Sequence, residues 1–301
     1  MSGRLRHAVG GTLAPRAGGV AGSDALVITD REFRHFQALV YRQTGIALGE
    51  QKRDLVRSRL GRRLREHGYA SFSQYAEHLA ERDPEHSELG RLINAITTTK
   101  TEFFREEHHF AFLRAELLAP LAAARDLPRR LRIWSAGCSS GEEPYSMAMT
   151  VLDAIPEAWA WDVRILASDI NTDMLAKAEA GVYSTEQMAR VPRAMREAYF
   201  ASCPGAKNGA VSVRPRVKAL VTFRQINLID APWPIRTSLD CIFCRNVLIY
   251  FDRSLQQQCV ARLVELLKPG GYLVLGGSES LLAMEQGLEN LRNSVYRKTD
   301  R

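Results

Sequence analysis

Apolar side chains recur three and four positions apart through the first third of the chain. The clearest groups are Phe33, Phe36, Leu39 and Val40, then Val56, Leu60 and Leu64, then Phe72, Tyr75, Ala76 and Leu79. Because a helix turns once in 3.6 residues, each group lies on one helical face. Thr29 or Asp30 can cap the first helix, and no alternating strand pattern interrupts the region. We predict a helical domain over residues 26–118, preceded by a disordered Gly-rich tail over residues 1–25.

From about residue 130 onward, short apolar runs alternate with helical segments. The predicted strands are Leu131–Ala136, Val163–Ser168, Val221–Gln225, Cys241–Cys244 and Tyr272–Gly276. The predicted helices between them are Glu142–Ile155, Thr172–Ala180 and Ser254–Leu267. Strands that alternate with helices form βαβ units, which build a mostly parallel sheet. We therefore predict an α/β domain over residues 119–301.

Three further segments are assigned from local pattern. Lys268–Gly271 is predicted to be a sharp turn, and Ser294–Lys298 an edge strand. Between residues 184 and 220 the alternation breaks: a helical piece, Thr185–Phe200, is followed by Val211–Val217 with period two. We interpret residues 184–220 as a small β-subdomain inserted into the α/β domain.

The composition is that of an ordinary globular protein, with 46% hydrophobic and 25% charged residues among 301. No stretch approaches the roughly 20 apolar residues of a membrane span, and the Gly-rich start lacks the apolar centre of a secretory signal. These features predict a cytoplasmic protein without membrane insertion. The net charge is +7, with most of the basic excess in the first half of the chain.

The C-x-x-C pair Cys241 and Cys244 has the spacing of zinc and redox sites. Both residues fall in a predicted strand, where side chains three positions apart point to opposite faces. No second pair is present to complete a tetrahedral site. We interpret them as buried core cysteines and expect no metal site.

The first predicted strand of the α/β domain leads through the turn Gly137–Gly141 to Glu142 and Glu143. A strand, a Gly-containing turn and a helix together form a site for nucleotide-like ligands at the carboxyl edge of a sheet. The G-x-G-x-x-G dinucleotide motif is absent, and two carboxylates would repel a phosphate at the helix N-terminus. They suit a cationic ligand such as S-adenosylmethionine, although acids there also simply complement the helix dipole.

Polar residues also follow the other predicted strands. Asp169 follows the second strand, where an acid commonly binds ribose hydroxyls, or it caps the next helix. Arg245 and Asn246 follow the fourth strand, and burying them is costly unless both have partners. They form part of a ligand site, or else a salt-bridged Arg and a capping Asn. Asn227, with Leu228 beside it, follows the third strand on the same edge.

A hydroxyl-rich segment, Thr97–Arg105, precedes the α/β domain. Its threonines come directly before Phe103, Phe104 and Arg105, so the segment is either a polar lip over an apolar wedge or a helix start capped by Thr101. The residues alone favour the helix start.

Several strings together resemble the CheR family of chemotaxis receptor glutamate methyltransferases. The most specific are G-x-x-x-G-E-E-P-Y-S at Gly137–Ser146 and C-R-N-x-x-I-Y-F at Cys244–Phe251; others are Tyr41–Ile46, Lys52–Val56, Thr97–Arg105, Ala167–Ile170 and Leu267–Gly271. The resemblance covers the chain from about residue 26. It implies an α/β fold with a Rossmann-like S-adenosylmethionine methyltransferase domain, a small all-α N-terminal domain and a small β insertion.

The resemblance also implies an activity and its residues. The activity is methyl transfer from S-adenosyl-L-methionine to receptor glutamates, giving glutamate methyl esters and S-adenosyl-L-homocysteine. The implied cofactor contacts are Thr99, Thr101, Arg105, Glu143, Asp169, Asn227, Leu228, Arg245 and Asn246. Arg105 and Tyr250 are implied to hold the acceptor carboxylate. Thr99 departs from the family, which usually has Asn there, and a hydroxyl cannot reproduce the paired donor and acceptor of an amide.

The implied partners are the cytoplasmic helices of chemoreceptors, which are typically acidic. In the basic segment Lys52–Arg65, Lys52, Arg59, Arg62 and Arg63 fall within an arc of roughly 100° on a helical wheel. This face is predicted to dock receptor helices, unless it is only a solvated surface. In some members of the family the β insertion grips a receptor tail peptide.

Three other functions remain open at this stage: methylation of a small carboxylate or another protein, nucleic-acid binding by the basic half, and cofactor sensing without catalysis. No nucleic-acid motif accompanies the charge, so we expect no nucleic-acid partner.

Overall fold

The computed structural model describes residues 26–124, 128–155, 157–203, 209–279 and 287–299, so the predicted tail lies outside the described residues. The N-terminal region contains the helices α1 Asp30–Thr44, α2 Arg53–His67, α3 Phe72–Glu81 and α4 Ser87–Ile96. A capping box between Thr29 and Glu32 begins α1, and Gly45, with φ of 72°, ends it in the left-handed conformation. The prediction of an all-helical N-terminal region is confirmed.

The helical region has its own apolar core. Phe36 stacks on Tyr75 and contacts Phe72 edge-on, while Leu60 and Leu64 of α2 pack into the same cluster. One polar network crosses this core. Arg63 donates two hydrogen bonds to the Glu88 carboxylate, and the Tyr75 hydroxyl donates a third at 2.8 Å.

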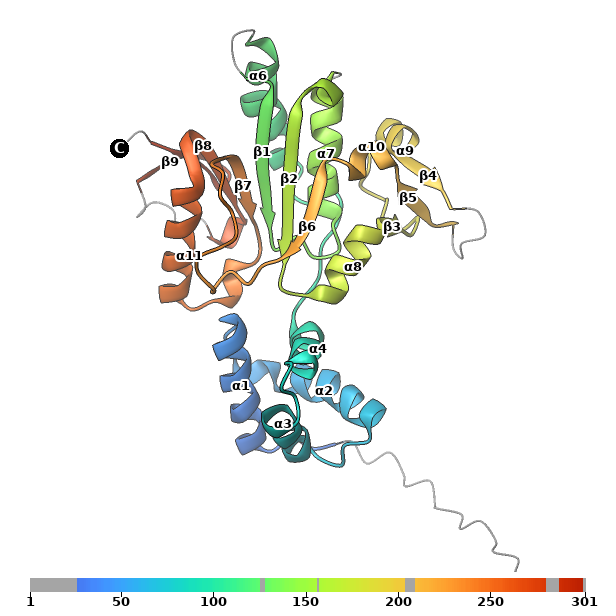
Figure 1. Cartoon of the computed structure of the whole chain (residues 1–301), viewed down its shortest axis with the longest axis vertical. Coiled ribbons are helices and arrows are strands. Elements are labelled where there is room, and N and C mark those ends of the chain that lie inside the picture. The colour runs from blue at the N-terminus through green and yellow to red at the C-terminus, as the bar shows by residue number, and fades with distance from the viewer. Residues whose placement is uncertain (1–25, 125–127, 156, 204–208, 280–286, 300–301) are drawn as a thin grey trace, which may run out of the picture.

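A seven-stranded sheet forms the centre of the larger region (Figure 1). Its strands are β1 Arg130–Ala136, β2 Asp162–Asp169, β6 Val221–Gln225, β7 Leu239–Cys244, β8 Leu267–Leu275, β9 Leu288–Arg292 and β10 Val295–Lys298. Their spatial order is β6-β2-β1-β7-β8-β10-β9, and the first five are parallel. The principal helices between them are α7 Glu142–Ala154, α8 Thr172–Ala180 and α11 Arg253–Leu266. The α/β prediction is confirmed.

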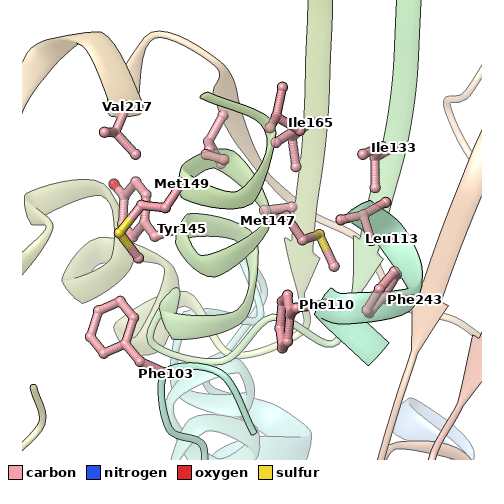
Figure 2. Close-up of a cluster of buried hydrophobic side chains, with 14 of the residues drawn as sticks. Phe103, Phe110, Leu113, Ile133, Tyr145, Met147, Met149, Ile165, Val217 and Phe243 are labelled. Carbon is pink, nitrogen blue, oxygen red and sulfur yellow. The ribbon is translucent and has the colours of Figure 1, made fainter. Parts of the chain in front are cut away.

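The sheet is buried on both faces. Ile133, Cys241 and Phe243 join a cluster with α7, part of which Figure 2 shows, whereas Ile242 and Cys244 pack on the other face with α11. Cys241 and Cys244 therefore point to opposite sides, as predicted. Burial raises the pKa of both thiols far above the ordinary value, so they are inert core residues.

A connecting segment leads from α4 to the sheet. It contains α5 His108–Phe112, a π-helical turn Leu113–Leu118 and α6 Ala119–Ala123. Phe103, Phe104 and Phe110 pack in the core cluster of the sheet. This packing agrees with the interpretation of Thr97–Arg105 as a polar lip over an apolar wedge. The alternative of a helix capped by Thr101 is wrong, because α5 begins only at His108.

Two predictions near the C-terminus are wrong. Lys268–Gly271 belongs to β8, whose register with β7 shifts between Leu239 and Cys241, so the Pro-Gly-Gly bend forms an irregular strand start and not a free turn. The predicted edge strand Ser294–Lys298 forms β10, which lies between β8 and β9. The actual edge strand is β9, which the pattern did not predict.

The insertion forms a three-stranded antiparallel sheet, and the predicted β-subdomain is therefore present. Its strands are β3 Val182–Tyr183, β4 Phe200–Ser202 and β5 Val211–Val213, in the order β3-β5-β4. Within the predicted helix Thr185–Phe200 only α9, Arg193–Tyr199, is α-helical, and turns precede it. The short helix α10, Pro215–Lys218, leads back to β6.

The polar network of the helical core generates the first prediction. Burial alone would raise the pKa of Glu88, but hydrogen bonds from Arg63 and Tyr75 outweigh it and hold that pKa below its ordinary 4.5. A lowered pKa stabilises the fold above the unfolded value, and this stabilisation is lost as pH falls through the folded value. We expect Glu88→Gln to lower the free energy of unfolding at pH 7 by about 2–3 kcal/mol.

Urea unfolding at pH 7 and at pH 3–5 measures both effects. The difference between wild type and Glu88→Gln should shrink as pH falls below about 4.5. The control is Glu66→Gln, which removes an exposed pair with Arg62 and should change stability little. Equal stability of Glu88→Gln and wild type at pH 7 would contradict the assignment.

Candidate functional site

A cavity of about 270 Å³ lies between the carboxyl edge of the sheet and the helical region, where residues of α1, α2 and α4 line it. The strand order reverses where β1 lies between β2 and β7, which is where open α/β sheets bind ligands. In Figure 1 the helical region faces this same edge, below the points of the strands. The loop between α1 and α2 and the segment Thr97–Arg105 complete the wall.

All ten residues predicted for the site line this one cavity. They are Thr99, Thr101, Arg105, Glu143, Asp169, Asn227, Leu228, Arg245, Asn246 and Tyr250. The sheet brings together those that follow β1, β2, β6 and β7, although they are far apart in the sequence. Their individual roles toward a ligand stay predictions.

The turn after β1 needs glycine for close approach. Gly137 has φ of 81°, and a Cβ there would overlap the Val247 side chain. The amides of Gly137 and Cys138 donate to the Ser168 carbonyl at 2.7 and 2.8 Å, so the turn is fixed to the end of β2. The cavity floor is thereby rigid at the point where β1 and β2 end.

The two acids at the start of α7 have different surroundings. Glu143 lines the cavity and accepts hydrogen bonds from Ser135 Oγ at 2.7 Å and Arg245 Nη1 at 2.9 Å. Glu142 does not line it; its carboxylate accepts from Ser140 Oγ and from Gln187 of the β-subdomain. Burial raises the pKa of Glu142. The expectation that both acids serve one cationic ligand is therefore wrong, because successive helix positions point about 100° apart.

Asp169 ends β2 with its carboxylate tied to backbone amides. It accepts from Ser139 N and Asn171 N, both at 2.8 Å. Burial raises the pKa of Asp169, and these amides act in the opposite direction. The helix cap of α8 is Asn171, which accepts from Met174 N, so Asp169 is not needed for capping. Its remaining lone pairs are available to a pair of hydroxyl donors.

Arg245 is the most buried charge of the cavity wall, with a side chain only 1% exposed. It forms ion pairs with Glu143 at 2.9 Å and with Glu106 at 3.1 Å, and it donates to the Arg105 carbonyl at 2.7 Å. The sequence left open whether Arg245 is part of a ligand site or is salt-bridged. It is salt-bridged, and it also lines the cavity. Its Nε is buried without a partner among the described residues, an orphaned donor that a ligand carboxylate would satisfy.

Asn246 adopts a left-handed conformation, with φ of 59°, and a single side chain holds this loop. The buried carboxylate of Glu279 accepts from the amides of Asn246 and Val247 at 3.0 Å, of Ile249 at 3.3 Å and of Gly276 at 2.6 Å. Burial raises the pKa of Glu279, and the amides oppose the shift. Glu279 was not predicted from the sequence, although its position three residues after the predicted strand Tyr272–Gly276 places it at the same edge.

The helical region contributes to the wall through direct hydrogen bonds. Asn227 Nδ2 donates to the Gln43 carbonyl at 2.8 Å, and Ala47 N donates to the Tyr250 carbonyl at 2.8 Å. Thr97 accepts from Asn171 at 2.7 Å. Helices α1 and α4 are therefore bonded to the loops that carry Asn227, Tyr250 and Asp169.

The basic face predicted on α2 is partly used inside the protein. Arg59 donates to the carbonyls of Ala95, Ile96 and Thr97, where it stabilises the C-terminal end of α4. Arg63 is paired with Glu88. Arg62 is 78% exposed, and Lys52 lines the cavity. The prediction that all four basic residues form one docking face is wrong for Arg59 and Arg63.

Within the described residues, no helix is both long enough and apolar enough to cross a membrane.

Comparison with known proteins places both regions in one family. The family model described as "CheR methyltransferase, all-alpha domain" matches residues 31–97, and "CheR methyltransferase, SAM binding domain" matches residues 99–297. The chain is 42% identical over 279 residues to chemotaxis protein methyltransferase 2 of Pseudomonas aeruginosa, covering 92% of this chain and 96% of the relative. It is 38% identical over 277 residues to the chemotaxis protein methyltransferase of Escherichia coli, covering 91% and 93%.

The Glu279 anchor generates the second prediction. In Glu279→Gln, the amide NH2 would face backbone N–H donors, so the loop of Arg245 and Asn246 would lose its fixed conformation. We expect affinity for S-adenosylhomocysteine to fall by about tenfold or more, since one charged hydrogen bond contributes roughly 1.5–3 kcal/mol. Calorimetric titration measures the affinity.

The matched control is Glu289→Gln, an exposed acid on β9 that should bind like wild type. Thermal unfolding of Glu279→Gln identifies any general loss of structure. Unchanged affinity in a folded Glu279→Gln protein would refute the anchor.

Proposed function

Since the chain belongs to the CheR methyltransferase family, whose S-adenosylmethionine-dependent methylation acts in chemotaxis, we propose that it esterifies glutamate side chains of chemotaxis receptors. We choose an anionic acceptor because of the contacts that the Arg105 side chain makes. It lines the cavity, and its guanidinium donates to the Lys100 carbonyl at 3.2 Å. No carboxylate within the described ranges lies within ion-pair distance of it, in contrast to Arg245.

The cavity residues suit S-adenosylmethionine, the cofactor of the family. Asp169 offers carboxylate lone pairs to ribose hydroxyls, and the partnerless Nε of Arg245 offers a donor to the cofactor carboxylate. Glu143 places negative charge near a cationic ligand. We assign the remaining contacts to Thr99, Thr101, Asn227, Leu228 and Asn246. The short hydroxyl of Thr99 makes its contact the least similar to the family pattern.

Bound S-adenosylmethionine supplies an electrophilic methyl group and leaves as S-adenosylhomocysteine. A glutamate carboxylate, with a pKa of about 4.3, is already ionised at neutral pH, so no general base is required. The protein must exclude water from this carboxylate and align one oxygen with the methyl group. Arg105 and the Tyr250 hydroxyl are assigned to hold it by charge-assisted hydrogen bonds. Such alignment can lower the barrier by up to roughly 7–11 kcal/mol.

Receptor docking is assigned to the exposed side of α2. Lys52 and Leu55, at the start of this helix, line the cavity, so a partner that lies along α2 reaches the cavity mouth. Arg57 is 44% exposed and Arg62 78% exposed, and Arg65 lies on the surface as well. These cations would attract the acidic cytoplasmic helices of chemoreceptors, which places the reaction in the cytoplasm.

The product distinguishes this function from its alternatives. We expect radiolabelled methyl from S-adenosylmethionine to transfer to purified receptor cytoplasmic fragments and to be released as methanol by mild base, because carboxyl esters hydrolyse there. Replacement of the acceptor glutamates in the receptor by alanine should abolish labelling. Base-stable label would indicate another acceptor atom, and binding of nucleic acid without methyl transfer would favour the non-enzymatic alternative.

The role of Arg105 gives the fourth prediction. We expect Arg105→Ala to lower methyl transfer by about 100-fold or more at saturating receptor, because the acceptor loses its charged donor. Arg105→Lys should recover only part, since a point charge cannot reproduce the planar fork. Initial rates measured at several receptor concentrations test this.

Arg62→Glu provides the contrasting variant. It should raise KM for the receptor while leaving S-adenosylhomocysteine affinity unchanged, because Arg62 lies on the outer surface of α2. Equal activity of Arg105→Ala and wild type would exclude Arg105 from acceptor binding.

A further inference from the structure

A cluster of three potential metal ligands lies beside Arg245, and none of the three lines the cavity. Glu106, His108 and His109 occupy the start of α5, and their ligand atoms all lie within 4.8 Å of one another. We refer to these three residues as the Glu106–His109 cluster. Methyl transfer as argued above uses none of them, and the sequence analysis predicted no metal site.

His109 carries an unpartnered lone pair at the centre of this cluster. Its side chain is fully buried, and its Nε2 lies 2.8 Å from the Asn293 carbonyl oxygen. A carbonyl only accepts, so Nε2 must carry the hydrogen, and Nδ1 of the neutral ring is then an acceptor. Nδ1 has no hydrogen-bond partner among the described residues. A buried acceptor without a partner is costly and calls for an occupant.

The nearest group to that lone pair is another acceptor. Glu106 Oε2 lies 3.4 Å from His109 Nδ1, too far and with the wrong polarity for a hydrogen bond between a neutral imidazole and a carboxylate. A separation of 3.4 Å leaves no room for a water molecule between the two atoms, so a direct bridge must be a proton or a metal ion.

We propose that Glu106, His108 and His109 bind one divalent transition-metal ion of the zinc type. Imidazole nitrogens with a carboxylate suit zinc and its neighbours better than magnesium or calcium, which prefer oxygen ligands. Three protein ligands leave a fourth position for water, and His108 is exposed on that side.

The surroundings of the cluster match those of known metal ligands. A ligating histidine typically donates its other N–H to a carbonyl or carboxylate, as His109 does to Asn293. A ligating carboxylate typically has a second polar partner as well, and Glu106 has one in its ion pair with Arg245 at 3.1 Å. Two atoms bound to one tetrahedral zinc ion lie about 3.3–3.5 Å apart, and His109 Nδ1 and Glu106 Oε2 are already 3.4 Å apart, so closing the site requires the exposed His108 ring to move toward them.

The charge of Arg245 does not exclude a cation at this position. Arg245 also pairs with Glu143 at 2.9 Å, so its charge stays compensated when Glu106 is shared with an ion. The inference goes beyond methyl transfer and holds whichever acceptor the enzyme uses. The ion would fix Glu106, and through it one side of the wall that carries Arg245.

Cobalt titration of the full-length, tag-free protein tests the proposal. Co²⁺ replaces zinc-type ions and reports four-coordinate binding by strong visible absorption. We expect one equivalent to bind without thiolate charge-transfer bands and to be displaced by Zn²⁺. His108→Ala should weaken binding at least about tenfold, since even residues outside the ligand set change metal affinity by 10–100-fold.

The matched control is His35→Ala, an exposed histidine on α1 that should bind cobalt like wild type. Titration with S-adenosylhomocysteine confirms that each variant is folded and is independent of the proposed acceptor. Equal cobalt binding by wild type and His108→Ala, absence of binding, or thiolate absorption would each overturn the site. The gap between His109 and Glu106 would then be bridged by a proton alone.

Discussion

The buried guanidinium of Arg245 fixes the cavity. A charge that is 1% exposed requires compensation, and here it comes from Glu143 of α7, Glu106 of the connecting segment and the Arg105 carbonyl. These groups arrive from separate parts of the chain. The Arg245 side chain therefore bonds the end of β7 to the start of α7 and to the segment that carries Arg105.

Backbone strain surrounds the same cavity. Phe104, Glu106, Ser139 and Asn246 all have positive φ, a conformation that non-glycine residues seldom adopt. Three of the four have their backbone N–H bound by a side chain far away in the sequence: Phe104 N by Ser146, Ser139 N by Asp169, and Asn246 N by Glu279. Carboxylates and a hydroxyl that bind backbone amides thus stabilise turns that would otherwise relax. The predicted contact residues Arg105 and Asn246 lie at or beside these positions, so the anchoring groups help to determine where these two side chains point.

Sequence patterns predicted the elements whose buried apolar residues recur at a regular spacing. They failed for elements with little burial. The strands β1 and β7 are mostly buried and apolar, β2 and β6 alternate buried with exposed positions, and each was predicted within one or two residues. The edge strand β9, Leu288–Arg292, alternates poorly because most of it is exposed, so it was missed. The residues at strand ends were predicted because parallel strands share one carboxyl edge. The orientation of Glu142 was not, since it depends on the exact phase of α7.

Long-range packing explains the errors on α2. A helical wheel places Arg59 and Arg63 beside Arg62, but only the folded chain brings the end of α4 and Glu88 against two of them. Net basic charge therefore overstates the surface available to a partner. The contacts in the folded chain also distinguish the two arginines of the cavity, Arg245 and Arg105. Arg245 is neutralised by two carboxylates and holds the wall, whereas Arg105 donates to a carbonyl and has no carboxylate within ion-pair distance in the part of the chain that the structure describes. Both residues are arginines, so the difference between a structural cation and a cation suited to an acceptor carboxylate lies in their surroundings.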